Sequence, residues 1–119
     1  MKTILIMSAL FLLTVSVASA EEKADTLTIK GVLIDNQCAQ ANKDKLLEFI
    51  KTHPKDCVLM PSCAASGLAI YADGKLTEFD TDSNAKILAF LKEKDSKLEV
   101  EVVAKKAGEK LSLVSIKNQ

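Results

Sequence analysis

The sequence predicts a mainly β (α+β) domain, a small five-stranded OB-like barrel. Five segments of the 119-residue chain have strand-like patterns. Two helix-like segments interrupt them, the second between the third and fourth strands, and Asp73-Gly74 marks a tight hairpin turn. The order strand, helix, strand, strand, helix, strand, strand is that of an OB barrel with an extra helix after its first strand. A less closed α+β sandwich is the alternative, and the element order favours the barrel.

The first twenty residues have the features of a signal peptide. Lys2 precedes an uncharged, mostly apolar run, and Ala18-Ser19-Ala20 supplies the small residues of a cleavage site. The run is short for a spanning helix, which needs roughly 20 apolar residues; an uncleaved anchor is the alternative. We predict a signal peptide at 1–20, a flexible lead-in at 21–25 and a single OB-like domain at 26–119. The protein is then exported, periplasmic or secreted, with no membrane span after cleavage.

The start of the domain combines a strand with a helix. The segment 26–35 is rich in strand formers, and Gly31 interrupts its alternation as a bulge or sharp bend would require. Apolar residues then recur at helical spacing over 42–52. Asn42 is a candidate N-cap for this helix, and Pro54 biases the preceding residue away from helical geometry.

The rest of the domain is predicted from alternation and turn chemistry. Strands at 67–72 and 75–79 flank the Asp73-Gly74 turn, where both residues need a positive φ. A capping segment beginning at Asp80 precedes a helix, and strands at 97–104 and 110–117 follow it. The expected buried stripe of that helix is Ala85, Ile87, Leu88 and Leu91.

Charge and composition argue against nucleic acid as a partner. The chain has 16 basic residues, all of them lysine, and 16 acidic residues. Nucleic-acid binders usually concentrate basic charge and add arginine or stacking aromatic side chains. We therefore predict a protein or small ligand of the cell envelope as the partner.

The segment 53–67 holds the sole histidine, both prolines and two of the three cysteines. Five residues separate Cys57 from Cys63, a loop that allows the short Cα separation of a disulfide in an oxidising compartment. We predict a Cys57–Cys63 disulfide that braces this loop. Pairing of Cys38 with either of them is the alternative, and one cysteine stays unpaired in every case.

A metal or redox site is a second interpretation of the same residues. Cys38, His53, Cys57 and Cys63 offer three thiolates and an imidazole, which suit zinc or copper. Their spacing matches no zinc finger or ribbon, and the chain has no C-x-x-C motif. Met60 is a candidate soft ligand for copper(I), although a methionine here is more often a buried anchor of the loop.

Catalysis by a cysteine–histidine pair is a third interpretation. His53 would act as base for a cysteine nucleophile, and Asp35 or Asp56 would orient the imidazole. Such an enzyme requires a thiol with a lowered pKa. Nothing in the spacing demands this arrangement, so the sequence favours a protein that is not an enzyme.

Two motifs give the chain a family resemblance. Asp35-x-x-Cys38, the downstream His53, the segment Cys57 to Gly67 with its C-x5-C-A-A-S-G pattern and the hairpin at 71–75 resemble a group of small exported bacterial proteins. The resemblance covers nearly all of 21–119 and is most specific over the cysteine segment. It implies an exported OB-like domain but no particular activity, and a site in this group would lie at Asp35, Cys38, His53, Cys57 and Cys63.

The interpretation that the sequence favours is a non-enzymatic binding or interaction module with a disulfide-braced cysteine loop. Its alternative is a periplasmic zinc-binding, copper-binding or thiol-redox protein that uses the Cys/His cluster.

Overall fold

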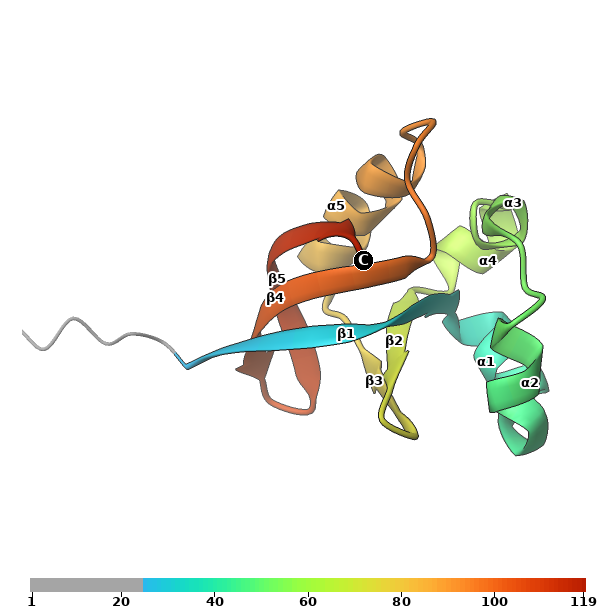
Figure 1. The fold of residues 1–119 in the computed structure, drawn as a ribbon, viewed down its shortest axis with the longest axis horizontal. Coiled ribbons are helices and arrows are strands. Elements are labelled where there is room, and N and C mark those ends of the chain that lie inside the picture. Colours follow the sequence, from blue (N-terminus) through green and yellow to red (C-terminus); the bar gives the residue numbers. More distant parts are fainter. Residues whose placement is uncertain (1–24) are drawn as a thin grey trace, which may run out of the picture.

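The computed structural model of the protein describes residues 25–119 (Figure 1). The predicted signal peptide, 1–20, and residues 21–24 of the predicted lead-in lie outside this range. The described strands form one antiparallel sheet in the order β3-β2-β1-β4-β5. Their bounds are β1 Thr26–Asp35, β2 Leu68–Ala72, β3 Lys75–Glu78, β4 Glu99–Ala107 and β5 Lys110–Asn118.

All five predicted strands are present, so the mainly β class and the strand order along the chain are confirmed. Strand β4 ends later than the sequence predicts because it stays paired with β5 up to a turn at Gly108, whose φ is 66°. The β2–β3 turn is also as predicted. Asp73 has a φ of 51° and Gly74 a φ of 75°, the positive values that a tight hairpin of this kind requires.

Gly31 marks the point at which β1 changes partners. β1 pairs with β4 from Thr26 to Val32 and with β2 from Val32 to Asp35, so the two pairings meet directly after the glycine. A Cβ atom at position 31 would lie 2.5 Å from the backbone oxygen of Tyr71 and 2.8 Å from Cγ1 of Ile70. The glycine therefore allows the backbone of β2 to approach β1 closely. The register of β1 shows no shift at Gly31, so the close approach takes the place of the predicted bulge.

Helix α5, Thr81–Leu91, covers one face of the sheet (Figure 1). Asp80 is its N-cap, as predicted, and its Oδ1 accepts a hydrogen bond of 2.9 Å from the backbone N–H of Ser83. Ile87 and Leu91 are buried as predicted and Leu88 is half-buried, but the prediction for Ala85 was wrong because this residue is exposed. Ser83 takes the buried position of that turn, where its hydroxyl accepts from the backbone N–H of Leu113 at 2.7 Å.

The segment between β1 and β2 contains four short helices and one 3-10 turn instead of one helix and a loop. They are α1 Asn36–Ala41, the 3-10 turn η1 Lys43–Lys45, α2 Leu46–Ile50, α3 Lys55–Val58 and α4 Pro61–Ala65. The predicted helix at 42–52 is thus broken. Asn42 precedes η1, as an N-cap does, but its side chain makes no capping hydrogen bond there. Its side-chain amide instead donates to the carbonyl of Cys38 at 2.9 Å and so ends α1.

Two apolar clusters lie on opposite faces of β1. The larger contains Leu33 and Val100 from the sheet, Ile87 from α5 and Val58 from α3. The smaller contains Ile34 and Ala69 with Ala39 of α1 and Ile50 of α2. Successive residues of a strand point to opposite faces, so Leu33 and Ile34 enter different clusters. Helices α1 to α4 consequently gather beyond the C-terminal end of β1 (Figure 1).

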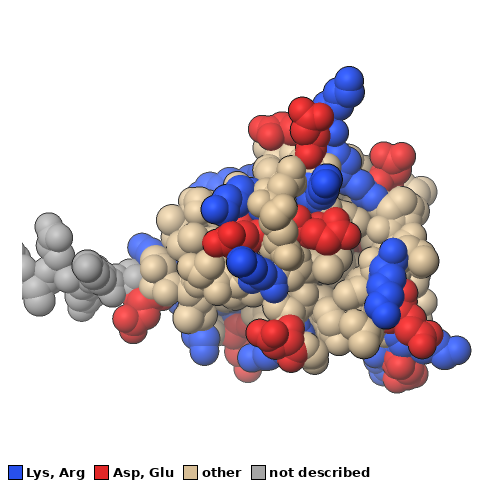
Figure 2. Space-filling view, viewed as in Figure 1, with Lys and Arg blue, Asp and Glu red and all other residues tan. Residues whose placement is uncertain are grey.

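The sheet is not closed into a barrel. Its edge strands meet through one isolated parallel bridge between Phe79 and Leu111, and the backbone N–H of Asp80 donates to the carbonyl of Leu111 at 2.9 Å. On the face in Figure 2, lysine and acidic side chains are interspersed, so neither sign forms a large separate area there. No helix within 25–119 is long and apolar enough to cross a membrane.

Candidate metal centre

Asp35 is the last residue of β1 and the first member of the centre. Its side chain is fully buried and caps α1, because Oδ2 accepts a hydrogen bond of 2.8 Å from the backbone N–H of Cys38. The Asp-x-x-Cys spacing thus has a structural cause, since an N-cap carboxylate reaches the amide three residues ahead. The other oxygen, Oδ1, has no hydrogen-bond partner among the described residues.

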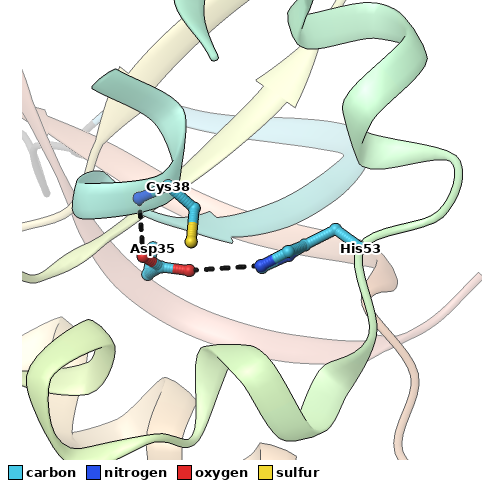
Figure 3. Close-up of side chains that lie close together, drawn as sticks. All are labelled: Asp35, Cys38 and His53. Carbon is cyan, nitrogen blue, oxygen red and sulfur yellow. Dashed lines mark hydrogen bonds and ion pairs between the residues drawn. The ribbon is translucent and has the colours of Figure 1, made fainter. Parts of the chain in front are cut away.

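His53 reaches the same place from the segment between α2 and α3 (Figure 3). The residue is buried, and its ring stacks at a tilt on Phe49, with a centroid separation of 4.9 Å. Nε2 lies 3.6 Å from Oδ1 of Asp35, beyond the usual hydrogen-bond range. Burial lowers the pKa of His53 and the charge of Asp35 offsets only part of this effect, so the neutral ring is favoured and has a lone pair to donate.

Cys38 supplies a sulfur atom to the pair. Its Sγ, one oxygen of Asp35 and one ring nitrogen of His53 all lie within 4.8 Å of one another, and Figure 3 shows the three side chains pointing toward a common point. Burial, followed by hydrogen bonding to and the charge of Asp35, raises the pKa of this thiol to about 12. The thiol therefore stays protonated at neutral pH unless a cation displaces its proton.

Cys63 lies beside Cys38 at the edge of this group. It is a buried residue of α4, and its proximity also contributes to the raised pKa of Cys38. Hydrogen bonds hold α1 against the end of α4. The backbone N–H of Gln37 donates to Oγ of Ser66 at 3.1 Å, and the side-chain amide of Asn36 donates to the carbonyl of Ser66 at 3.0 Å. The Ser66 hydroxyl in turn donates to the carbonyl of Cys63 at 2.6 Å.

The donor atoms of Asp35, Cys38 and His53 have the chemistry of a transition-metal site. Zinc binds carboxylate oxygen, imidazole nitrogen and thiolate sulfur at about 2.0–2.3 Å, which puts neighbouring ligand atoms of a tetrahedral site roughly 3.3–3.8 Å apart. The 3.6 Å separation between Asp35 and His53 falls in this range. Buried polar atoms normally have hydrogen-bond partners, whereas Oδ1 of Asp35 and both ring nitrogens of His53 have none among the described residues. A bound cation would satisfy such atoms.

Of the four predicted metal ligands, the structure brings together Cys38 and His53, with Cys63 beside them. Cys57 is half-buried in α3 and is not part of the three-residue group. Asp35 belongs to it, although the sequence suggested this residue only as a site candidate that could orient the imidazole. Asp56, the alternative carboxylate, is exposed.

Met60 lies at the surface, and the three cysteines are not bonded to one another. Met60 is 53% exposed, so its expected burial as an anchor of the loop was wrong; Val58 is buried and takes that role. The three cysteines carry free thiols in the structure. The Cys57–Cys63 disulfide therefore stays a prediction.

A surface hollow of about 610 Å³ lies near the centre but does not include it. Residues of α1, η1, α2 and the β2–β3 hairpin line this hollow, and none of Asp35, Cys38, His53 and Cys63 is among them. The enclosed position of the centre suits a bare ion better than an organic ligand.

Comparison with protein-family models, with curated proteins and with solved structures finds no match for this chain. The basis for assigning a function is therefore the geometry of the centre itself.

Proposed function

We propose that the protein is a zinc-binding protein of the cell envelope whose centre consists of Asp35, Cys38 and His53. The observation that carries the proposal is the buried pair Oδ1 of Asp35 and Nε2 of His53, which face each other at 3.6 Å without a hydrogen bond while a thiol lies within reach of both. Isolated buried polar atoms cost free energy, and a shared cation offsets this cost. The sequence alone favours a binding module with a disulfide-braced loop, with metal binding as the alternative; the geometry of the centre favours the metal-binding alternative.

Zinc fits the donor set better than copper(I). Copper(I) favours soft thiolate and thioether ligands, whereas zinc accepts a carboxylate together with imidazole and thiolate. The fully buried Asp35 would be a poor ligand for copper(I), and the thioether of Met60 does not belong to the group. Cys63 is the candidate fourth ligand, because it is the remaining sulfur beside Cys38.

A cysteine–histidine enzyme has less support. That interpretation requires a thiol with a lowered pKa, whereas the surroundings of Cys38 raise its pKa to about 12. Binding of an ion would drive the thiol to its thiolate form by displacing the proton, so the raised value is compatible with a ligand role. A non-enzymatic binding protein therefore remains the favoured class.

The OB-like barrel and export belong to the same proposal. The parallel bridge between Phe79 and Leu111 joins the residue after β3 to β5, and contact between these two strands would close a five-stranded OB barrel of this strand order. The signal-peptide pattern at 1–20 supports export, and the interspersed charges in Figure 2 support a partner other than nucleic acid.

The test is zinc binding by the reduced full chain and by three variants. Asp35→Asn preserves the side-chain shape and an oxygen for the α1 cap but removes a ligand charge, and Cys38→Ser removes the sulfur. Cys57→Ser is the matched control, because Cys57 is a cysteine outside the group. A competing chromogenic chelator gives the zinc affinity, and substitution with cobalt(II) reports thiolate ligation through its charge-transfer band.

We expect one ion per wild-type chain and an affinity at least about 100-fold weaker in Asp35→Asn and Cys38→Ser, since loss of an outer-shell partner alone costs 10–100-fold. Cys57→Ser should bind like the wild type. Equal affinity in wild-type and Cys38→Ser protein would contradict the proposal, as would loss of binding in Cys57→Ser. Tighter binding of copper(I) with no dependence on Asp35 would reassign the metal.

A further inference from the structure

The thiols of Cys38 and Cys63 form a second functional unit at the centre. Cys38 is half-buried in α1 and Cys63 is buried in α4. The two sulfur atoms are near each other but not at bonding distance. Their helices are joined by the hydrogen bonds of Ser66 to Asn36 and Gln37.

We propose that Cys38 and Cys63 are a reversible redox pair and that their oxidation to a disulfide releases the bound zinc. The part of the proposal that concerns zinc rests on the proposed function, whereas formation of the disulfide does not. The backbone N–H of Asn36 also donates to the carbonyl of Gly67 at 2.9 Å, so α1 is tied to both Ser66 and Gly67 at the end of α4. To bring the sulfur atoms of Cys38 and Cys63 to the S–S bond length of about 2.05 Å, the two side chains must therefore move more than their helices.

The oxidant is a disulfide of the cell envelope, small-molecule or protein. Cys38, the more exposed of the two, loses its proton and attacks one sulfur of that disulfide, and the first leaving thiolate takes up the proton. Because the raised pKa of Cys38 leaves little thiolate at neutral pH, this first step is slow, unlike attack by the activated nucleophile of an enzyme. The sulfur of Cys63 then attacks Cys38 in the mixed disulfide, expels the second leaving thiolate and passes its proton to it. Two protein thiols are oxidised by two electrons, and one external disulfide is reduced to two thiols.

Loss of zinc follows from the change in ligands. A disulfide sulfur carries no negative charge, so the bond between Cys38 and Cys63 removes one proposed ligand and the candidate fourth ligand together. Asp35 and His53 alone would leave half of a tetrahedral site. Bound zinc conversely occupies the sulfur lone pairs and protects both thiols, so reduction restores the site and metal loading stabilises the reduced form.

The pairing also competes with the disulfide that the sequence predicts. Cys63 can bond to Cys38 or to Cys57, and the hydrogen bonds between α1 and α4 favour Cys38 as its partner. Peptide mapping separates the two cases. Trypsin cleaves after lysine and places Cys38 in peptide 31–43, whereas Cys57 and Cys63 share peptide 56–75.

The experiment treats the reduced, metal-free full chain with oxidised glutathione and maps the product by mass spectrometry. We expect peptides 31–43 and 56–75 to become cross-linked, and cleavage at Met60 to leave the cross-link on the fragment with Cys63. The Cys57→Ser variant should give the same cross-link, and Cys63→Ser should not. With free zinc at about ten times its Kd, the rate of cross-linking should fall about tenfold, and oxidation of the loaded protein should release the ion.

Three other results of the oxidation experiment would each contradict a different part of the proposal. An internal disulfide in peptide 56–75, with Cys38 still open to alkylation, overturns the redox pair and establishes the Cys57–Cys63 bond. Absence of any cross-link in a chain that binds zinc also overturns the pair and leaves the proposed function in place. A Cys38–Cys63 cross-link that forms equally fast with and without zinc, and that releases no ion, overturns the coupling between oxidation and zinc release. This result also counts against the zinc site, whereas the redox pair is then confirmed.

Discussion

Lys55 provides a sensitive test of how the segment carrying His53 is held in place. Lys55 is the first residue of α3, and its ammonium group donates to the carbonyls of Glu93 and Ser96 at 3.1 and 2.7 Å. A third bond of 3.1 Å joins it to the Ser96 hydroxyl. The side chain therefore ties α3 to the turn between α5 and β4, and Lys55→Met removes this tie while preserving an unbranched side chain.

The loss of stability expected for Lys55→Met depends on which hydrogen bonds each acceptor group keeps in the variant. The Glu93 carbonyl still accepts from the Ser96 hydroxyl at 2.7 Å, and that hydroxyl is therefore also still bonded. The part-buried Ser96 carbonyl loses the shortest of the three bonds. One hydrogen bond from a charged donor contributes about 1.5–3 kcal/mol, so we expect a loss of about 2 kcal/mol in the free energy of unfolding. For a domain of this size the melting temperature should fall by about 8–16 °C.

Thermal unfolding followed by circular dichroism measures the effect, with Lys94→Met as control. Lys94 is exposed in the same turn and forms no ion pair or side-chain hydrogen bond among the described residues, so its replacement removes the same charge without the tie. Equal melting temperatures for the two variants would refute the reasoning and show that α3 is held by its apolar contacts alone.

Two further predictions concern the sheet and helix α5. Gly31→Ala places a Cβ atom 2.5 Å from the Tyr71 carbonyl oxygen, so β1 and β2 must separate; we expect a loss of about 1–3 kcal/mol in urea unfolding, and unchanged stability would show that β2 can move aside. Asp80→Ala removes the cap of α5 and should cost about 1 kcal/mol at pH 7, whereas Asp80→Asn should retain most of it. The side chain and backbone N–H of Ser83 donate to Asp80 and lower its pKa below 3.8, so this charge stabilises the fold above pH 4 and its contribution is lost as the pH falls through the lowered value. Unfolding at pH 7 and pH 3 should therefore show a smaller difference between wild type and Asp80→Asn at pH 3, and a constant difference would contradict the assignment.

The strands and the hairpin could be predicted because their signals are local. Alternation places Val100 and Val102 on the buried face, and Asp73-Gly74 defines its turn without help from the rest of the chain. The helices between β1 and β2 could not be predicted in the same way. Helices of four to six residues cover fewer than two periods of a helical pattern and are marginal alone, so contacts with the rest of the domain determine them.

The members of the centre were visible in the sequence, but their grouping was not. Asp35, Cys38 and His53 all stood out as site candidates, and the cap explains the spacing of the first two. The approach of His53 depends on the path of residues 36–52, which the broken helix determines. For the same reason the sequence could not show that Cys63 lies beside Cys38 while Cys57 stays outside the group.

The position of β1 in the middle of the sheet has a consequence for the order of folding. Its residues from Thr26 to Val32 pair with β4, so Thr26 can form this pairing only after Lys105 has been synthesised. The side chain of Gln119 also donates to the carbonyls of Gly31 and Val100, at 3.1 Å each. Contacts so distant along the chain make folding slow. A polypeptide that leaves a ribosome or a translocation pore N-terminus first can assemble β1, β2 and β3, but one edge of β1 then stays unpaired. An unpaired edge invites association with other chains, so a chaperone that shields residues 26–32 until β4 emerges should raise the yield of folded protein.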